Sequence, residues 1–391
     1  MVKPTQTTQF YRPELDGLRF FAFLLVFLQH LPVPDGYTSP RTFGGFLFDL
    51  RLHGWMGVDL FLCLSSFLVA KLLLLEWQAN GFVSIKNFYI RRVFRIWPLY
   101  FWVCLLGFLI FPLLGWFGVS WMGADHLTLL KTYLWPYLLL VGNWATTIYG
   151  YPPFNFLAPL WTISLEEQFY LVGPILLVLV RFEKKAVLKL SGLLLFLTFA
   201  ARIGALVMGT RFPTIWVCTL TRLDPFVLGT CLAIFEDELI LFAKKFSPVG
   251  IGLAGVALLL NVVILFDVEQ RTTSVIWQYF LMDLGFCCLI FSMTRLDSLK
   301  KFFSKVFFTR LGKISYGLYV YHILAFRLTM PLMLLIIRKA AFRFDLASSE
   351  VIVFSMGLAM TVIISFLSYQ VLEKTFLKLK VRFTAIESRP I

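Results

Sequence analysis

Charged residues are scarce in this chain. Asp, Glu, Lys and Arg make up 15% of its 391 residues, whereas soluble domains carry about 25%. The chain also lacks a hydrophilic stretch long enough to fold as a separate soluble domain. We therefore expect residues 1–391 to form a single membrane-embedded domain.

The signals of metal and nucleic-acid binding are weak as well. All six cysteines lie in apolar segments without the paired spacing of zinc ligands, so we interpret them as small hydrophobic side chains and expect no metal. The net charge of +14 is compatible with a nucleic-acid partner. However, the basic residues cluster between apolar runs, which is the pattern of membrane topology, and we expect no nucleic-acid partner.

Apolar sequence is abundant instead. Hydrophobic residues make up 59% of the chain and its mean hydropathy is +0.81. The runs are long and continuous, which predicts an all-α, polytopic membrane bundle of about ten helices. The expected spans are 18–33, 55–76, 95–117, 159–180, 188–208, 214–235, 248–267, 273–294, 314–337 and 351–372. The first span lacks a small-residue cleavage site, so we expect it to remain in the mature protein.

The distribution of basic residues tests this topology. With the N-terminus inside, 24 of the 36 Lys and Arg fall in inner segments and eight in outer segments, while four lie within or at the end of a span. Because positive charge concentrates on the cytoplasmic side, both termini are predicted to be cytoplasmic.

Residues 133–149 are apolar, but Pro136, Gly142 and Asn143 interrupt them. Counting them as a span would invert every later loop and reverse the charge bias. We therefore expect a re-entrant or surface segment on the outer side, where Trp and Tyr suit the membrane interface.

Arg19 and His30 lie on the first span with ten residues between them. At about 1.5 Å per residue they are separated by roughly 16 Å along the helix axis, about half the hydrocarbon thickness. A charged group and an imidazole are costly to bury in a membrane, so such residues usually mark a functional site. The pair predicts a fixed positive charge near the inner face and a proton-transfer group towards the outer face.

Other ionisable residues share the expected depth of His30. They are Asp59, Glu166, Glu167, Arg222 and Asp224. General acid–base chemistry needs an imidazole that takes a proton and a carboxylate that orients it. His30, oriented by Glu167 or Asp59, is therefore the predicted catalytic group.

Ordinary structural roles compete with this interpretation. An acid near a helix N-terminus suits the helix dipole, so Asp59, Glu166 and Glu167 could act as caps. His30 could hydrogen-bond a neighbour at the membrane interface. Several ionisable groups at one depth favour a polar cavity instead. His322, about midway along the ninth span, is a second-tier candidate.

A basic cluster lies at the expected inner face. Such a cluster can anchor an amphipathic helix on anionic lipid. It can also bind phosphate, because Arg92 and Arg95 are three residues apart, share a helix face and carry guanidinium forks that match phosphate oxygens. We predict that a phosphate-rich donor from the cytoplasm docks there.

These residues fall in motifs that occur in order between residues 12 and 322. They are RPELDGLR with His30 (12–30), GVDLF and LSSF (57–67), RVFRIWP (92–98), WTISLEEQFY (161–170), RLDPFVLG (222–229) and SYGLYVYH (315–322). Together they resemble the acyltransferase-3 family of integral membrane acyltransferases, whose members acylate surface glycans, lipopolysaccharide and exopolysaccharides. The Arg-x10-His spacing inside RPELDGLR is the most specific of them.

The resemblance implies an acyl-coenzyme A donor, usually acetyl-coenzyme A, that enters from the cytoplasm. It implies an acceptor hydroxyl on a glycan or lipid-linked saccharide near the outer leaflet of a bacterial inner membrane. It makes His30 the catalytic histidine and Arg19 the residue that positions the donor. If the chain is such an acyltransferase, we expect Arg19, Arg92 and Arg95 together to bind the phosphates of the donor.

The resemblance also identifies lesser candidates in its motifs. They are Asp16, Ser65, Glu166, Arg222, Asp224 and His322. One departure from the family pattern is Ser66, where glycine is common. Its side chain is expected to narrow the passage at that turn.

Three functions are compatible with these observations. An O-acyltransferase explains the buried ionisable groups, with His30 as general base or as carrier of a transient acyl group. The alternative is a transporter of a sugar or lipid-linked glycan, which the lack of an internal repeat disfavours. A non-catalytic membrane scaffold explains the topology but not the ionisable groups. The acceptor, the acyl length and the oligomeric state stay open.

Overall fold

The computed structural model describes residues 10–31, 51–116, 126–153, 155–210, 212–266, 272–340 and 346–386. Within these ranges the regular structure is helical, without strands. The main helices are α1 (Pro13–Gln29), α3 (Met56–Asn80), α4 (Ile85–Leu105), α8 (Leu160–Leu179), α9 (Lys184–Val207), α11 (Asp224–Ile234), α13 (Pro248–Leu265), α14 (Val275–Met293), α17 (Ser315–Ala340) and α18 (Leu346–Ser368).

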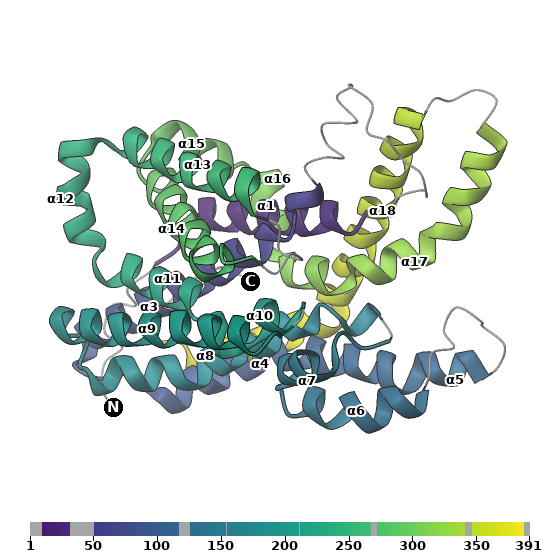
Figure 1. Ribbon diagram of the computed structural model, residues 1–391, viewed down its shortest axis with the longest axis horizontal. Coiled ribbons are helices and arrows are strands. Elements are labelled where there is room, and N and C mark those ends of the chain that lie inside the picture. Colours follow the sequence, from purple (N-terminus) through teal and green to yellow (C-terminus); the bar gives the residue numbers. More distant parts are fainter. Residues whose placement is uncertain are drawn as a thin grey trace.

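Shorter helices connect these elements. They are η1 (Arg51–His53), η2 (Leu106–Ile110), α5 (Phe111–Trp116), α6 (His126–Leu138), α7 (Gly142–Tyr149), η4 (Asn155–Leu157), α10 (Thr214–Val217), η5 (Thr219–Thr221), α12 (Glu236–Phe246), α15 (Asp297–Phe303), α16 (Val306–Lys313), η6 (Tyr369–Glu373), α19 (Lys374–Lys380) and η7 (Val381–Phe383). Figure 1 shows α17 and α18 on the side of the molecule opposite α12, with α5, α6 and α7 gathered below them.

The helical, polytopic architecture is confirmed. Among the described residues, seven helices are long and apolar enough to cross a membrane, and each overlaps a predicted span. They are Met56–Asn80, Ile85–Gly115, Leu160–Leu179, Lys184–Val207, Pro248–Leu265, Val275–Met293 and Val351–Phe383. The first and ninth predicted spans correspond to α1, with 17 residues, and α17, with 26. The count of about ten and the cytoplasmic termini stay predictions.

The prediction of a continuous sixth span over 214–235 is wrong. This stretch divides into α10, η5 and α11, with an irregular connection around Arg222. Pro225 explains the division, because proline disfavours helical conformation in the residue before it and is well suited to a helix start. The carbonyl oxygen of Thr221, freed by the break, accepts a hydrogen bond of 2.9 Å from the buried Arg202 side chain.

The predicted interruption within residues 133–149 is present. α6 ends at Leu138 and α7 begins at Gly142, with Leu140 between them in the left-handed region at φ 60°. The location of this segment relative to the membrane stays a prediction.

α1 lies at the centre of the packing that positions the site. It contacts α3, α16 and α17. A Cβ on Gly57 of α3 would collide with the carbonyl oxygen of Ala22, so glycine allows the two helices to approach closely. On the other side of α1, the rings of Phe27 and Phe326 stack with centroids 4.7 Å apart. This contact sets α1 against α17 one turn before His30.

The start of α1 is fixed by a cluster of charges. Glu236 of α12 accepts from Arg12 at 2.8 Å and pairs with Lys71 at 2.6 Å and Arg295 at 2.5 Å. Burial would raise the pKa of Glu236, but the hydrogen bonds and charges of Lys71 and Arg12 lower it overall. Because three elements converge on one carboxylate, the orientation of α1 is determined at its N-terminus.

Candidate active site

His30 at the end of α1 lies against His322 of α17. The centroids of the two imidazole rings are 4.8 Å apart, and the rings meet edge to face at 65°. His30 is exposed, whereas His322 is fully buried. The second-tier candidate His322 is therefore the ring that the fold brings to the predicted catalytic histidine.

Backbone carbonyls orient both rings. His30 Nδ1 lies 2.9 Å from the carbonyl oxygen of Val26, and His322 Nδ1 lies 2.5 Å from that of Tyr319. A carbonyl oxygen only accepts hydrogen bonds, so Nδ1 carries the proton in each ring. Nε2 is then the nitrogen with a lone pair in the neutral form of either histidine.

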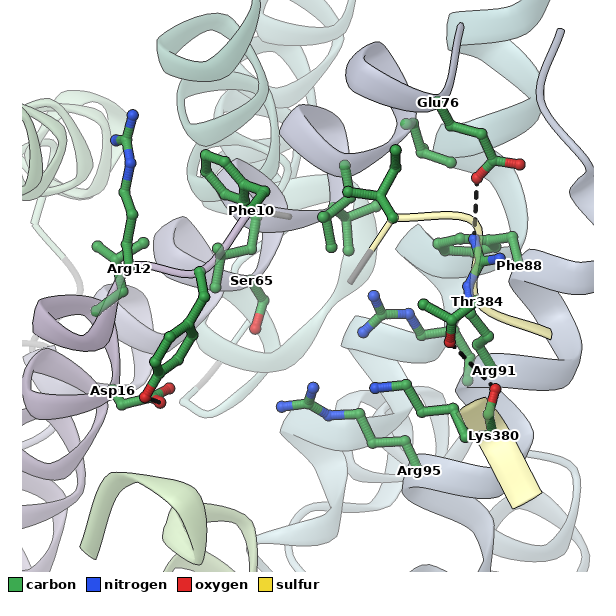
Figure 2. A pocket seen from close by; sticks show the side chains of 18 of the residues that line it. Phe10, Arg12, Asp16, Ser65, Glu76, Phe88, Arg91, Arg95, Lys380 and Thr384 are labelled. Atoms are coloured by element: carbon green, nitrogen blue, oxygen red, sulfur yellow. Dashed lines mark hydrogen bonds and ion pairs between the residues drawn. The ribbon is translucent and has the colours of Figure 1, made fainter. Parts of the chain in front are cut away.

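At the other end of α1 lies a pocket of about 850 Å³, including its open mouth, lined by basic side chains. α1 contributes Arg19, α4 contributes Arg92 and Arg95, and α19 contributes Lys380. These four cations form no salt bridge within the described residues. Figure 2 shows Arg95 and Lys380 extending side by side into the pocket, while Arg12, which also lines it, extends away from these two side chains.

The pocket wall also contains neutralised charges. Arg91 pairs with Glu76 at 3.2 Å and donates to the carbonyl oxygen of Phe383 at 2.7 Å, which holds η7 over the pocket. Asp16 lines the same pocket and accepts from the Tyr11 hydroxyl at 3.1 Å. The candidate Asp16 is thus part of this basic pocket rather than of the histidine pair.

A second pocket, of about 650 Å³, continues from the first. Arg19, Ser65 and Arg95 line both, so they form the passage between the two. The second pocket also reaches Thr162 and Tyr319. The Tyr319 hydroxyl accepts a hydrogen bond from the Thr162 hydroxyl at 2.9 Å. The ring centroids of Tyr319 and His322 are 5.9 Å apart. The two pockets therefore lead from the basic end of α1 to the residues beside the histidines.

The acids of α8 have partners other than His30. Tyr170 donates its hydroxyl to Glu166, which lines the second pocket. Glu167 accepts from the indole nitrogen of Trp97 at 3.1 Å. Among the described residues, the polar contact of His30 is the Val26 carbonyl, so the expected pairing of His30 with Glu167 is not formed in this structure.

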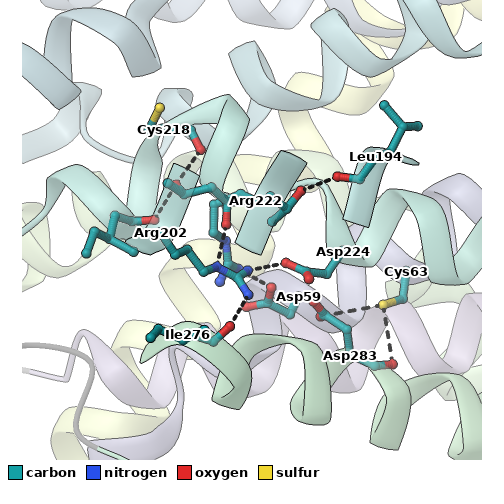
Figure 3. Close-up of polar contacts among 12 residues, drawn as sticks. Asp59, Cys63, Leu194, Arg202, Cys218, Arg222, Asp224, Ile276 and Asp283 are labelled. Atoms are coloured by element: carbon teal, nitrogen blue, oxygen red, sulfur yellow. Dashed lines mark hydrogen bonds and ion pairs between the residues drawn. The ribbon is translucent and has the colours of Figure 1, made fainter. Parts of the chain in front are cut away.

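Asp59 lies in a buried ion-pair network. Arg222 donates to Asp59, and its guanidinium stacks over Trp216 at 4.5 Å and over Tyr279 at 4.2 Å. In the same cluster, Arg202 donates to Asp224, and all four charged side chains are fully buried (Figure 3). The structure thus brings Asp59, Arg222 and Asp224 together with one another and with Arg202. The expected contact of Asp59 with His30 is corrected accordingly.

The expected narrowing of the passage by Ser66 is wrong. Its hydroxyl is fully buried and donates to the carbonyl oxygens of Leu62 and Pro225, both at 2.9 Å. A Cβ on Gly229 of α11 would collide with this hydroxyl. Ser66 therefore joins α3 to α11, and its neighbour Ser65 lines the passage instead.

Sequence reasoning missed several residues of the site. Charge counting treats Lys380 only as one of the basic residues that indicate topology, and no motif marks Asp283, which is fully buried beside Cys63. Tyr319 belongs to a motif but was given no role. Its position within three residues of His322 on one helix was the signal that could have identified it.

The fold and site define a class of protein. It is a helical membrane protein in which one helix connects a pocket lined by basic side chains with a pair of adjacent histidines at its far end. The family comparison agrees with this class: the model of an acyltransferase domain family matches residues 12–370. The chain belongs to this acyltransferase family.

The curated relatives are named O-acetyltransferases. A putative O-acetyltransferase of Staphylococcus aureus is 25% identical over 94% of this chain and 58% of its own length. The peptidoglycan O-acetyltransferase OatA of Listeria monocytogenes is 25% identical over 85% of this chain and 52% of its own. The O-acetyltransferase OatA of S. aureus is 27% identical over 80% of this chain and 50% of its own length. The chain thus spans about half the length of these relatives. No solved structure matches it.

Proposed function

We propose that this protein is a membrane O-acyltransferase that moves an acyl group, acetyl in the first instance, from acyl-coenzyme A to a hydroxyl of a cell-surface or lipid-linked glycan. The observation that carries the proposal is the order of three features: four cations that form no salt bridge among the described residues around one pocket, a second pocket that shares Arg19, Ser65 and Arg95 with the first, and a histidine pair next to Tyr319 in the wall of the second.

The basic pocket supports a donor rich in phosphate. Arg19 is 8% exposed and, like Arg92, Arg95 and Lys380, forms no salt bridge in the described part of the chain. Like charges packed together destabilise a fold unless an anion neutralises them. Coenzyme A carries a diphosphate and a 3′-phosphate at one end and its thioester at the other, which matches a basic entrance followed by a less charged passage.

His30 supplies the chemistry in this proposal. Its Nε2 lone pair takes the proton of the acceptor hydroxyl while the hydroxyl oxygen bonds to the thioester carbonyl carbon. The carbon–sulfur bond then breaks, and the thiolate of coenzyme A takes the proton from His30. The products are the ester and free coenzyme A. The exposure of His30 supports access for an acceptor as large as a glycan.

The acceptor class comes from the relatives. The Listeria protein is named a peptidoglycan O-acetyltransferase, and we propose a glycan hydroxyl of this kind as the acceptor here. Peptidoglycan fragments are the first acceptors to test, followed by other surface glycans.

The test uses the full-length chain reconstituted in lipid vesicles with radiolabelled acetyl-coenzyme A and muropeptide or chitooligosaccharide acceptors. Transfer of label to the acceptor, with one acetyl group of added mass per labelled site and release of free thiol, would support the proposal. If glycan crosses the vesicle membrane while acetyl-coenzyme A is not consumed, the protein is a transporter and the proposal fails.

Lys380 provides a prediction for the donor site. Replacing it with alanine removes one of the cations facing the pocket, and a charge-assisted contact to phosphate contributes about 1.5–3 kcal/mol. We expect Lys380→Ala to raise the KM for acetyl-coenzyme A about tenfold or more, with kcat little changed. Steady-state kinetics at constant ionic strength measures both.

Two further variants control this result. Lys380→Arg keeps the charge and should retain most donor affinity. Lys378 is exposed on the same helix and does not line the pocket, so Lys378→Ala should leave KM unchanged. An equal rise of KM in the Lys378 and Lys380 variants would indicate a general loss of surface charge instead of a phosphate contact.

A further inference from the structure

The role of His322 is not explained by donor binding or by His30 acting alone. Its ring is fully buried in α17, and its Nε2 has no hydrogen-bond partner among the residues that the structure describes. A buried polar atom without a partner costs free energy, so such atoms often take part in function. The side chain next to this ring is His30, the proposed base.

In both rings Nε2 is the nitrogen that can accept a proton, because Nδ1 already carries one. Nδ1 of each ring donates to a backbone carbonyl one turn earlier on its own helix, at Val26 for His30 and at Tyr319 for His322. When both rings are neutral, each therefore has a lone pair on Nε2 and no proton on that atom.

Three of the carboxylates predicted at the depth of His30 have other partners among the described residues. Asp59 binds Arg222, Glu166 accepts from Tyr170, and Glu167 accepts from Trp97. An imidazolium is costly to bury without a counter-ion, and two adjacent ones repel each other. We therefore expect the pair to hold one additional proton at a time, and the second ring lies beside the first with the ring centroids 4.8 Å apart.

We propose that His322 is a positioning residue that shares the proton His30 removes from the acceptor hydroxyl. This inference rests on the proposed acyl transfer and adds a partner to its base. As the hydroxyl oxygen bonds to the thioester carbon, its proton moves to His30 Nε2, and the resulting cation is stabilised by the lone pair of His322. When the carbon–sulfur bond breaks, the proton passes to the thiolate sulfur, and both imidazoles are neutral again.

The packing holds the second ring where this role requires it. Phe326, one turn beyond His322, stacks on Phe27, one turn before His30. Tyr319, one turn before His322, is fixed by the 2.9 Å hydrogen bond from Thr162. His322 therefore sits between a contact to α1 and the end of the second pocket, with little freedom to move.

Two amide substitutions separate proton sharing from a structural role. The amide nitrogen of asparagine can replace Nδ1 as donor to the Tyr319 carbonyl, but asparagine has no atom at the place of Nε2. Glutamine reaches the position of Nε2 and can accept a hydrogen bond there, but it cannot take a proton. Each variant is purified as the full-length chain in vesicles, with monodispersity and thermal stability measured beside activity.

We expect His322→Asn to lower kcat about 100-fold or more, within the usual range for loss of acid–base assistance, while the KM for acetyl-coenzyme A stays within about twofold. We expect His322→Gln to retain more activity than His322→Asn, because it restores an acceptor beside the charged His30. We also expect the pH dependence of kcat in both variants to differ from that of the wild-type protein, because the ring that shares the proton with His30 is lost.

Wild-type activity in His322→Asn would overturn the inference, because the hydrogen bond to the Tyr319 carbonyl oxygen would then be enough for activity without an atom at the place of Nε2. Equal losses in both variants, accompanied by lower thermal stability, would also overturn it and assign His322 to folding. If the wild-type protein itself transfers no acetyl group, the proposed function fails first, and this inference fails with it. An inactive wild-type protein can be distinguished from an inactive His322 variant, because the variant is assayed in parallel with the wild-type protein.

Discussion

Replacing His30 with alanine is expected to abolish acyl transfer while the protein remains folded in membranes. Without the imidazole, the acceptor hydroxyl has no base at the end of the passage, and loss of acid–base assistance commonly lowers rates by 10²–10⁴-fold. Because His30 is exposed and its hydrogen bond among the described residues is to a carbonyl of its own helix, removal of the ring breaks no hydrogen bond to another helix within that part of the chain. We therefore expect kcat to fall about 100- to 10,000-fold with unchanged thermal stability.

The measurement is transfer of label from acetyl-coenzyme A to glycan by the reconstituted protein, with thiol release followed in parallel. His53 of η1 provides a matched control, because it is a histidine outside both pockets. His53→Ala should transfer acetyl groups at the wild-type rate. Normal acylation by His30→Ala would remove the basis for assigning catalysis to this residue.

A second readout separates the two chemical roles left open for His30. If the acyl group is carried transiently by the imidazole, labelled acetyl-coenzyme A without acceptor should label the wild-type protein and not the His30→Ala variant. If His30 acts only as base, the wild-type protein should remain unlabelled under the same conditions. Quenching at short times followed by mass spectrometry of the protein distinguishes the two.

The depth of the site could be predicted from the sequence, but its lateral arrangement could not. Hydropathy places residues along the membrane normal, and the cost of burying charge selected Arg19 and His30. Depth does not determine which face of a helix a side chain occupies or which helix lies opposite. Asp59 was therefore assigned to His30 on depth, whereas α3 presents it to Arg222 in the network beside α11 and α14.

The contact of His30 with His322 depends on packing that the sequence does not encode locally. α1 and α17 are far apart in the chain, and the stack of Phe27 on Phe326 sets their register. Lys380 illustrates the same limit, since charge counting treats it as a topology signal. Only the return of α19 and η7 over α4 turns it into a pocket residue.

The ion-pair network predicts the largest effect on stability. Arg222→Gln removes the partner of Asp59 and leaves three fully buried aspartates, Asp59, Asp224 and Asp283, with Arg202 alone. Breaking a buried ion pair on one side costs about 3–5 kcal/mol, because the remaining charge is uncompensated. We expect a large fall in the melting temperature, measured by intrinsic tryptophan fluorescence, and loss of activity through unfolding.

The paired substitution then decides what Asp59 does. Asp59→Asn combined with Arg222→Gln removes both charges and keeps side chains of similar size, so most of the stability lost in Arg222→Gln should return. The exposed pair Lys184 and Glu238 is the control, since surface ion pairs contribute little and its removal should leave the melting temperature unchanged.

Activity of the paired variant separates a structural from a catalytic carboxylate. If Asp59 serves only to hold Arg222, the stable double variant should transfer acetyl groups at a rate near that of the wild type, because His30 and His322 are untouched. A double variant that is stable but inactive would mean that the carboxylate itself assists His30, against the contacts seen here. The restored melting temperature is what makes the second result interpretable, since inactivity could then no longer be attributed to unfolding.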